Sequence, residues 1–259
     1  MNNQQNLGLP LEYQQMPEYF DAQNVNVETE VNNALIERLL NAHNVKSVLD
    51  MTCGTGSQVF YLHQRGYEII GSDFSSPLIR QAREKARSRG VDIRFLEGDM
   101  RELEVGKFDA VISIFNAIGH LSKWDFAKAL KNIRANLKDG GIYIFDIFNL
   151  EAISDKVIQD FDMEIESTVN GVKIKHTQHS EVDRENSLLT SHDHYTIFKE
   201  SEKLEIRTNT FHLQIYTAQE LKDLLMQNGF ETVYQCDMNG KGFVADKSLS
   251  VLTVARKRG

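Results

Sequence analysis

A short run of the sequence combines glycine and acidic residues in a way that suits ligand binding. The run extends from Val48 to Gly56, leaves an apolar segment at Asp50 and leads into a predicted helix. Gly54 and Gly56 let the backbone approach a ligand closely, and the turn presents amide groups at a helix N-terminus. We therefore expect this glycine loop to bind a small ligand.

Two further carboxylates end the next two apolar segments. Asp73 follows the second segment, and Asp99, in the step Gly98-Asp99-Met100, follows the third. A carboxylate at the first position can accept both hydroxyls of a ribose, and one at the second can accept the exocyclic amine of an adenine. Together they predict an adenosine that lies across the carboxyl ends of three adjacent strands.

A nicotinamide dinucleotide is the main rival ligand for this site. The glycine motif of proteins that bind this dinucleotide requires glycine or alanine at position 59, where this sequence has Val59. Asp50 also places negative charge where a pyrophosphate would be unfavourable. The same Asp50 suits a ligand with a cationic amino acid tail, and an adenosine joined to an amino acid without phosphate is S-adenosylmethionine.

Alternation of strands and helices from Ser47 to Phe148 positions these residues. Short, near-continuous apolar segments are typical of strands covered on both faces. They predict five strands: Ser47–Met51, Tyr67–Ser72, Ile93–Leu96, Ala110–Phe115 and Ile142–Phe148. Their short links to the intervening helices predict a parallel sheet with right-handed crossovers.

After Asn149 the pattern changes to alternating apolar and polar residues. Four segments show it: Met163–Val169, Val172–His179, Ser187–Phe198 and Leu204–Ile215. Asn170-Gly171 between the first two predicts a tight hairpin. A helix returns at Thr217, which forms a capping box with Glu220. Two late strands complete the pattern, Glu231–Cys236 and Leu249–Ala255.

The predicted fold class is α/β: a doubly wound, seven-stranded, mostly parallel sheet with an antiparallel β insertion between the fifth strand and the last helix. We expect an N-terminal helical cap at residues 1–44, a Rossmann-like core at residues 45–150 and 217–259, and a lid at residues 151–216. The insertion has too little apolar content for an independent domain, which is why we interpret it as a lid on the core.

The glycine loop, Asp73 and the Gly98–Met100 step resemble the class I S-adenosylmethionine-dependent methyltransferases, bacterial small-molecule members among them. The resemblance covers residues 47–149 by motif and residues 217–256 by architecture. It implies that the glycine loop binds the methionine end of the cofactor, the second-strand acid the ribose and the third-strand step the adenine. The expected cofactor-binding set is Tyr19, Asp50, Thr52, Gly54, Gly56, Asp73, Phe74, Asp99, Met100 and Phe115.

Two details of this set need comment. Thr52 departs from the family pattern, in which glycine is more common, and a β-branched residue disfavours positive φ. We therefore expect ordinary backbone dihedrals at Thr52. Tyr13 and Tyr19 precede the first long helix, in a segment that related enzymes use to cover the cofactor; the alternative is a tyrosine that only packs its ring.

Four residues outside the cofactor set are candidates for contact with a methyl acceptor. Asn116 and His120 follow the fourth strand, at the crevice where this fold places its chemistry. We expect Asn116 to orient the acceptor and His120 to act as a general base or to contact the acceptor. Tyr195 and His212 lie on polar faces of the insertion, which we expect to line the inner surface of the lid. The alternative for each is a purely structural contact.

A metal site is not expected. Five of the eight histidines fall in the insertion, and His192 and His194 share a strand face. Spacing fixes no cysteine or acidic partner for them, and zinc needs three or four converging ligands. Cys53 is expected to pack rather than to act as a nucleophile, because no paired histidine is indicated.

Composition and charge argue against several other classes of protein. The 259 residues include 29 Lys and Arg against 37 Asp and Glu, and this formal charge of −8 argues against a dedicated nucleic-acid binder. The basic residues between Arg80 and Arg89 are interleaved with Glu84, as on a solvated helix face. No apolar stretch is long enough to predict a membrane span, and no signal peptide is visible. Two distant cysteines favour a reducing, cytoplasmic setting.

These observations predict a methyltransferase that uses S-adenosylmethionine and acts on a small-molecule acceptor. The insertion resembles that of bacterial small-molecule and amino-sugar N-methyltransferases, and this resemblance favours nitrogen over oxygen as the acceptor atom. A neutral amine can attack without a strong base, whereas a hydroxyl would need one. An RNA methyltransferase and a non-catalytic protein that binds an adenosine ligand are the two alternatives. Nucleic acid and membrane are not expected partners, and no feature of the sequence specifies an oligomeric state.

Overall fold

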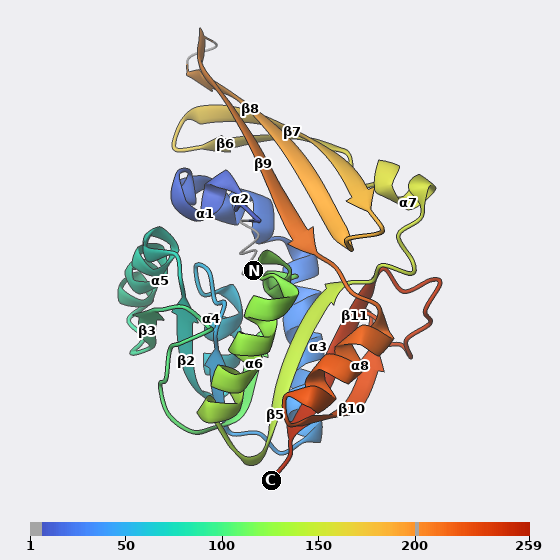
Figure 1. Cartoon of the computed structure of the whole chain (residues 1–259). Helices are drawn as coiled ribbons and strands as arrows, with labels where there is room; N and C mark the ends of the chain where they lie inside the picture. The colour runs from blue at the N-terminus through green and yellow to red at the C-terminus, as the bar shows by residue number, and fades with distance from the viewer. Residues whose placement is uncertain (1–6, 200–201) are drawn as a thin grey trace.

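A seven-stranded sheet forms the centre of the fold in the computed structural model, which describes residues 7–199 and 202–259 (Figure 1). Its strands run in the order β10-β11-β5-β4-β1-β2-β3, and β11 runs in the direction opposite to the other six. The bounds are β1 (Ser47–Asp50), β2 (Glu68–Asp73), β3 (Arg94–Glu97), β4 (Phe108–Ser113), β5 (Leu137–Phe148), β10 (Phe230–Cys236) and β11 (Ser250–Lys257). The predicted fold class is confirmed.

Helices cover both faces of this sheet. Apolar side chains of α3 (Val27–Ala42), α4 (Ser57–His63) and α5 (Ser76–Arg89) pack on one face, and those of α6 (Lys123–Asn136) and α8 (Ala218–Gln227) on the other. Along β1, Val48 contributes to the first core cluster and Leu49 to the second. This double burial is why the core strands show continuous apolar runs.

The insertion forms a second, four-stranded antiparallel sheet, called the upper sheet below. Its strands are β6 (Met163–Val169), β7 (Val172–Asp183), β8 (Leu188–Lys199) and β9 (Glu202–Gln214), in that order, and α7 (Asp155–Gln159) leads into them. It lies between β5 and α8 in the sequence, as predicted. Asn170 and Gly171 join β6 to β7 with φ values of 51° and 78°, as a tight hairpin turn requires.

The N-terminal residues lie between the two sheets (Figure 1). Residues 7–24, called the cap segment below, contain α1 (Leu11–Gln14), the 3₁₀ turn η1 (Pro17–Tyr19) and α2 (Phe20–Asn24). Residues 1–6 of the expected cap lie outside the described residues. Helix α3, which we assigned to the cap, packs against α4 in the core instead.

Polar contacts join the cap segment to the core and to the upper sheet. On the core side, Thr55 Oγ1 donates to Asp21 Oδ1 at 2.5 Å, and Lys85 pairs with the same carboxylate. On the other side, Tyr195 Oη donates to Glu12 Oε2 at 3.0 Å. Burial raises the pKa of Glu12, a residue of the cap segment that contacts the upper sheet. The cap segment therefore holds the upper sheet against the strand ends of the core.

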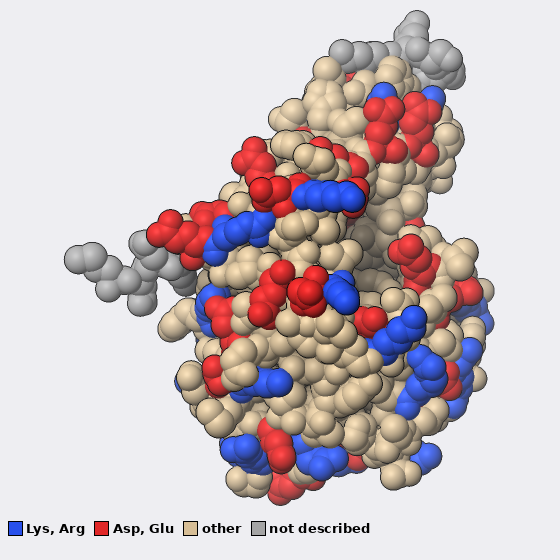
Figure 2. All heavy atoms as spheres, turned by 90° about the vertical axis from the view of Figure 1, so that its right-hand side faces the viewer, with Lys and Arg blue, Asp and Glu red and all other residues tan. Residues whose placement is uncertain are grey.

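The face shown in Figure 2 is hollowed between the upper sheet and the core, and acidic and basic side chains are mixed around it. None of the helices in the described part of the chain is long and apolar enough to cross a membrane.

Candidate functional site

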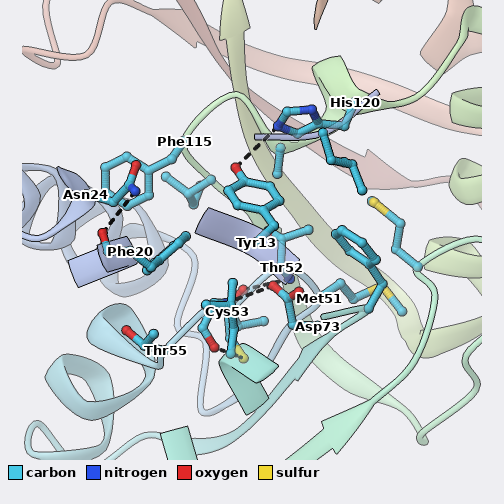
Figure 3. A pocket seen from close by; sticks show the side chains of 18 of the residues that line it. Tyr13, Phe20, Asn24, Met51, Thr52, Cys53, Thr55, Asp73, Phe115 and His120 are labelled. Carbon is cyan, nitrogen blue, oxygen red and sulfur yellow. Dashed lines mark hydrogen bonds between the residues drawn. The ribbon is translucent and has the colours of Figure 1, made fainter. Parts of the chain in front are cut away.

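A large cavity lies where the ends of β1, β2 and β4 meet beneath the cap segment (Figure 3). Its volume is about 660 Å³, within the range typical of small-molecule sites. Tyr13 lies in the middle of the view, with His120 on one side and Thr52 and Asp73 on the other. The cavity is thus built by the strand ends and closed by the N-terminal residues.

The glycine loop forms part of the cavity floor. Gly54 and Gly56 have φ values of 53° and 92°, whereas Thr52 is not among the residues with positive φ. A Cβ added at Gly54 would lie 2.9 Å from Cζ of Phe20. The ring of the cap residue Phe20 therefore rests directly on the loop, and glycine is needed both for the turn and for this contact.

Asp73 ends β2 and fastens the glycine loop to it. Its Oδ2 accepts the Gly54 amide and its Oδ1 the Ser75 amide, each at 2.9 Å. The side chain lines the cavity although it is only 6% exposed. Burial raises the pKa of Asp73 to about 6, and the two amide hydrogen bonds limit the rise. Each carboxylate oxygen keeps a lone pair that can accept a ligand hydroxyl.

Asp50 is a second carboxylate in the cavity floor. It is 3% exposed and accepts one described hydrogen bond, from the Thr52 amide at 3.1 Å. Burial raises the pKa of Asp50 to about 7, and the charge of Asp73 adds to the effect. A cation at this end of the cavity would stabilise the ionised carboxylate.

Asp99 lines the cavity after β3, but its oxygens already have a partner. Arg101 donates to both of them through Nε, at 3.0 and 2.9 Å, and through Nη2 at 2.6 Å. The other arm of the same guanidinium donates to Asp125 at 2.9 Å. These hydrogen bonds lower the pKa of Asp99 against the effect of its partial burial. Asp99 therefore stays ionised and Arg101 is neutralised by two carboxylates.

Tyr13 and His120 meet across the cavity. Tyr13 Oη lies 3.2 Å from Nε2 of His120, and the two rings are 5.3 Å apart at 71° (Figure 3). Burial lowers the pKa of His120 to about 4 and raises that of Tyr13. Both side chains are therefore neutral near pH 7. The other ring nitrogen of His120, Nδ1, is buried without a hydrogen-bond partner among the described residues.

The structure brings most of the predicted cofactor set to the cavity and leaves five candidates outside its lining. The predicted residues that line it are Asp50, Thr52, Gly54, Asp73, Phe74, Asp99, Met100, Phe115 and His120. Gly56 is the N-cap of α4 and packs against Phe60 and Phe95. Asn116 follows β4 as the N-cap residue of the 3₁₀ turn η2 (Ala117–His120), and its Oδ1 is buried without a partner among the described residues.

Three of the predicted residues lie instead where the cap segment meets the upper sheet. Tyr19 packs against Tyr195 with ring centroids 6.2 Å apart. His212 accepts or donates a hydrogen bond at Thr190 Oγ1, 2.8 Å away, and its backbone amide donates to Leu7. The structure thus gives Tyr19, Tyr195 and His212 contacts within the protein, and their expected roles toward ligands stay predictions.

Several residues that line the cavity were not predicted from the sequence. The most prominent are Phe20, Asn24 and Val25 from the cap region and Asp125 from α6. Their only sequence signal is the aromatic pair at positions 19 and 20, which does not show which ring faces a ligand. Asp146 on β5 was also missed, although it is the one charged residue in the apolar run from Ile142 to Phe148.

Within the described ranges, no three histidine, cysteine or acidic side chains converge as a metal site would require. His192 donates or accepts a hydrogen bond with Thr210, and His194 with Thr196. Cys53 is buried and unpaired, and burial raises the pKa of its thiol.

Residues 48–141 match the family model for a methyltransferase domain. A glycine/sarcosine N-methyltransferase from Parasynechococcus marenigrum is 36% identical over 132 residues, which cover 49% of this chain and 47% of that protein. A demethylmenaquinone methyltransferase from Thermus thermophilus is 40% identical over 100 residues, covering 37% and 44%. The chain spans about half the length of these relatives.

Solved structures resemble the whole chain. An S-adenosylmethionine-dependent methyltransferase from Clostridium acetobutylicum superimposes with a TM-score of 0.76 at 18% identity, covering 94% of this chain and 98% of that one. The sugar N-methyltransferase KedS8 from Streptoalloteichus gives a TM-score of 0.74 at 18% identity, covering 100% and 97%. At this identity the likeness shows a shared fold, core and insertion together.

Proposed function

We propose that this chain is a class I S-adenosylmethionine-dependent methyltransferase and that it transfers the methyl group to the nitrogen of an uncharged small molecule. The observation that carries the proposal is the cavity in which the glycine loop, Asp50 and Asp73 meet the neutral pair Tyr13 and His120. Cofactor groups and an acceptor can be held there side by side.

The residues of the cavity floor fit the cofactor. Asp50 is suited to its amino group, because a cation relieves the buried negative charge. Asp73 has lone pairs for the ribose hydroxyls, and Met100 with Phe74 provides apolar surface for the adenine. Asp99 would accept the adenine amine only by sharing its oxygens with Arg101. When bound, the cofactor supplies a methyl group activated by its sulfonium.

The chemistry of His120 favours nitrogen over oxygen as the acceptor atom. With a pKa lowered to about 4 by burial, His120 is a weak base and is poorly matched to removing a hydroxyl proton. A neutral amine carries its own lone pair and needs mainly orientation and the exclusion of water. Tyr13 and His120 line the cavity and are the polar groups that we expect to orient such an amine.

The charge of the cavity favours an acceptor without an anionic group beside the amine. Four carboxylates line the cavity, and the one guanidinium among the lining residues, Arg101, is bound by two of them. The cavity lining also includes the apolar side chains of Leu7, Leu9 and Leu121. An amino acid such as glycine would bring a carboxylate into this field, whereas an amino sugar would not. The sugar N-methyltransferase with the same fold supports this choice.

The basic helix α5 gives little support to an RNA substrate. Arg83 donates to the Phe95 carbonyl, Lys85 pairs with Asp21, and Arg89 lies over the Phe60 ring. These side chains thus serve contacts within the protein. The cavity is also covered by the cap segment, which suits a small acceptor better than a polynucleotide. Unpaired, buried Cys53 and Cys236 are consistent with the cytoplasmic setting that we propose.

Methyl transfer to matched acceptors tests the proposal. The protein is incubated with S-adenosylmethionine carrying a labelled methyl group and with an amino sugar, the parent sugar with hydroxyl in place of the amine, and glycine. We expect labelled product from the amino sugar or another uncharged amine, together with S-adenosylhomocysteine. Label on the sugar hydroxyl would overturn the choice of nitrogen, and label on glycine the choice of an uncharged acceptor.

A further inference from the structure

Strand β4 ends in an unusual backbone turn at the cavity wall. Phe115 and Asn116 are consecutive and both left-handed, with φ values of 65° and 56°. The other described non-glycine residues with positive φ are asparagine or serine, so Phe115 is the one bulky residue among them. A bulky side chain in this region is strained, and such strain is retained where the surrounding structure enforces it.

The enforcing group is a buried carboxylate on the neighbouring strand. Asp146 Oδ1 accepts the Phe115 amide at 2.7 Å, and its Oδ2 accepts the Asn116 amide at 3.2 Å. Asp146 is 2% exposed and lies in β5 between the fully buried Phe145 and Ile147. Burial raises the pKa of Asp146 to about 6, which the two amides limit. A charge is thus kept inside the core to fix two amides of one turn.

The turn determines where the Phe115 ring lies. Both Ile114, the residue before it, and Phe115 line the cavity, but Ile114 is buried in the core whereas the Phe115 side chain is 42% exposed. Figure 3 shows the ring on the same side of the cavity as Asn24 and Phe20 of the cap segment. An apolar ring held partly exposed by a strained backbone gains little for folding, so its position suggests contact with a ligand.

We propose that Asp146 is a positioning residue for the cofactor: it holds the Phe115–Asn116 turn so that the Phe115 ring forms one wall of the cofactor site. The inference rests on the proposed function, because it assumes that S-adenosylmethionine occupies the cavity. Asp146 itself is not among the residues that line the cavity and acts only through the turn.

A purely stabilising role for Asp146 is the competing explanation, and the chain contains a matched control for it. Asp109, at the other end of β4, also accepts two backbone amides, from Lys46 at 3.1 Å and Ser47 at 2.8 Å. It does not line the cavity. Replacing either carboxylate by an amide weakens the capping of two amides, but only Asp146→Asn disturbs the Phe115 turn.

Calorimetric titration with S-adenosylhomocysteine separates these explanations without requiring turnover. We expect Asp146→Asn to weaken the Kd by about tenfold or more, and Asp109→Asn to leave it unchanged, with thermal denaturation run on both. Phe115→Gly removes the ring and suits the left-handed backbone, so it should fold and bind about as weakly as Asp146→Asn. In the Phe115→Gly background, Asp146→Asn should cause little further loss of affinity.

The outcomes are distinct. Wild-type affinity in Asp146→Asn or in Phe115→Gly overturns the inference alone, as does a full additional loss when the two changes are combined. If Asp146→Asn does not fold, the affinity of Phe115→Gly still decides whether the ring is part of the site. Failure of the wild-type protein to bind S-adenosylhomocysteine overturns the proposed function, and the inference with it.

Discussion

Asp50 should make the affinity for the cofactor depend on pH. The carboxylate is 3% exposed, and burial together with the charge of Asp73 raises its pKa from 3.8 to about 7. A shift of one pKa unit corresponds to about 1.36 kcal/mol, so this rise means that the ionised form of Asp50 is about 4 kcal/mol less stable in the folded, unliganded protein than in water. An ammonium group on the ligand offsets part of this cost, because it stabilises the charged form.

The direction of the effect follows from which protonation state binds the ligand. Below about pH 7 the Asp50 carboxyl of the free protein is protonated and must lose its proton to pair with the ligand's amino group. Above that pH it is already ionised. We therefore expect the Kd for S-adenosylhomocysteine to be about tenfold weaker at about pH 6 than at about pH 8, with release of a proton on binding at the lower pH.

Calorimetric titrations at these two pH values measure the effect directly. Buffers with different ionisation enthalpies report the proton release. Asp50→Asn removes one of the two titrating carboxylates of the cavity floor, so it should reduce the pH dependence and weaken the binding at high pH; the part that remains comes from Asp73, whose pKa burial raises to about 6. Asp109→Asn removes a carboxylate outside the cavity and should leave the dependence as in the wild type. Equal wild-type affinity at both pH values would refute the assignment of the amino group to Asp50.

Three further predictions concern the loop and the cap segment. Asp73→Ala leaves two amides without their acceptor, at about 1–3 kcal/mol each, so the unfolding temperature and the affinity for S-adenosylhomocysteine should both fall; wild-type affinity would exclude Asp73 from the ribose site. Gly54→Ala places a methyl group 2.9 Å from Phe20 at a φ of 53°, where an L-residue costs about 1–2 kcal/mol. Thermal denaturation and calorimetry should show weaker folding and binding, and no change in either would mean that Phe20 is not seated on the loop. Tyr195→Phe deprives the buried Glu12 of its donor, so the protein should lose about 1–3 kcal/mol of stability at unchanged kcat; a fall in kcat at wild-type stability would instead make Tyr195 catalytic.

The floor of the site was predictable because it depends on local order in the sequence. Asp50, Gly54 and Asp73 each follow an apolar run that is recognisable as a buried strand, and parallel strands end at the same edge of a sheet. The structure accordingly places all three in the cavity. What the sequence could not show is that Asp73 also fastens the loop through the Gly54 amide, because that bond joins two strands.

The cap segment, which covers the cavity, was harder to predict because short irregular helices show no reliable hydrophobic periodicity. Tyr13 on α1 reaches His120, whereas Tyr19 on η1 turns to the upper sheet and packs against Tyr195. Alternation along β8 and β9 predicts two faces for each strand, but it does not show that the cap segment covers one of them. Tertiary contacts therefore decided the positions of Tyr195 and His212.

Asp99 and Asp146 show two different limits of reading a sequence. Asp99 was placed correctly after β3, but its pairing with Arg101, two residues on, depends on a turn that motif spacing does not describe. Asp146 carries a clear signal, a lone acid in an apolar strand, since a buried charge needs partners. Its role depends on the pairing of β4 with β5, where Ser113 lies opposite Phe145, and this register is not visible in the sequence.

A crystal structure of the complex with S-adenosylhomocysteine would test the central claim most directly. We expect the ligand in the cavity beneath the cap segment, with its ribose hydroxyls within hydrogen-bond distance of Asp73 and its amino group beside the glycine loop and Asp50. The Phe115 ring should contact it. Density for the ligand elsewhere, or a ribose that does not contact Asp73, would contradict the account.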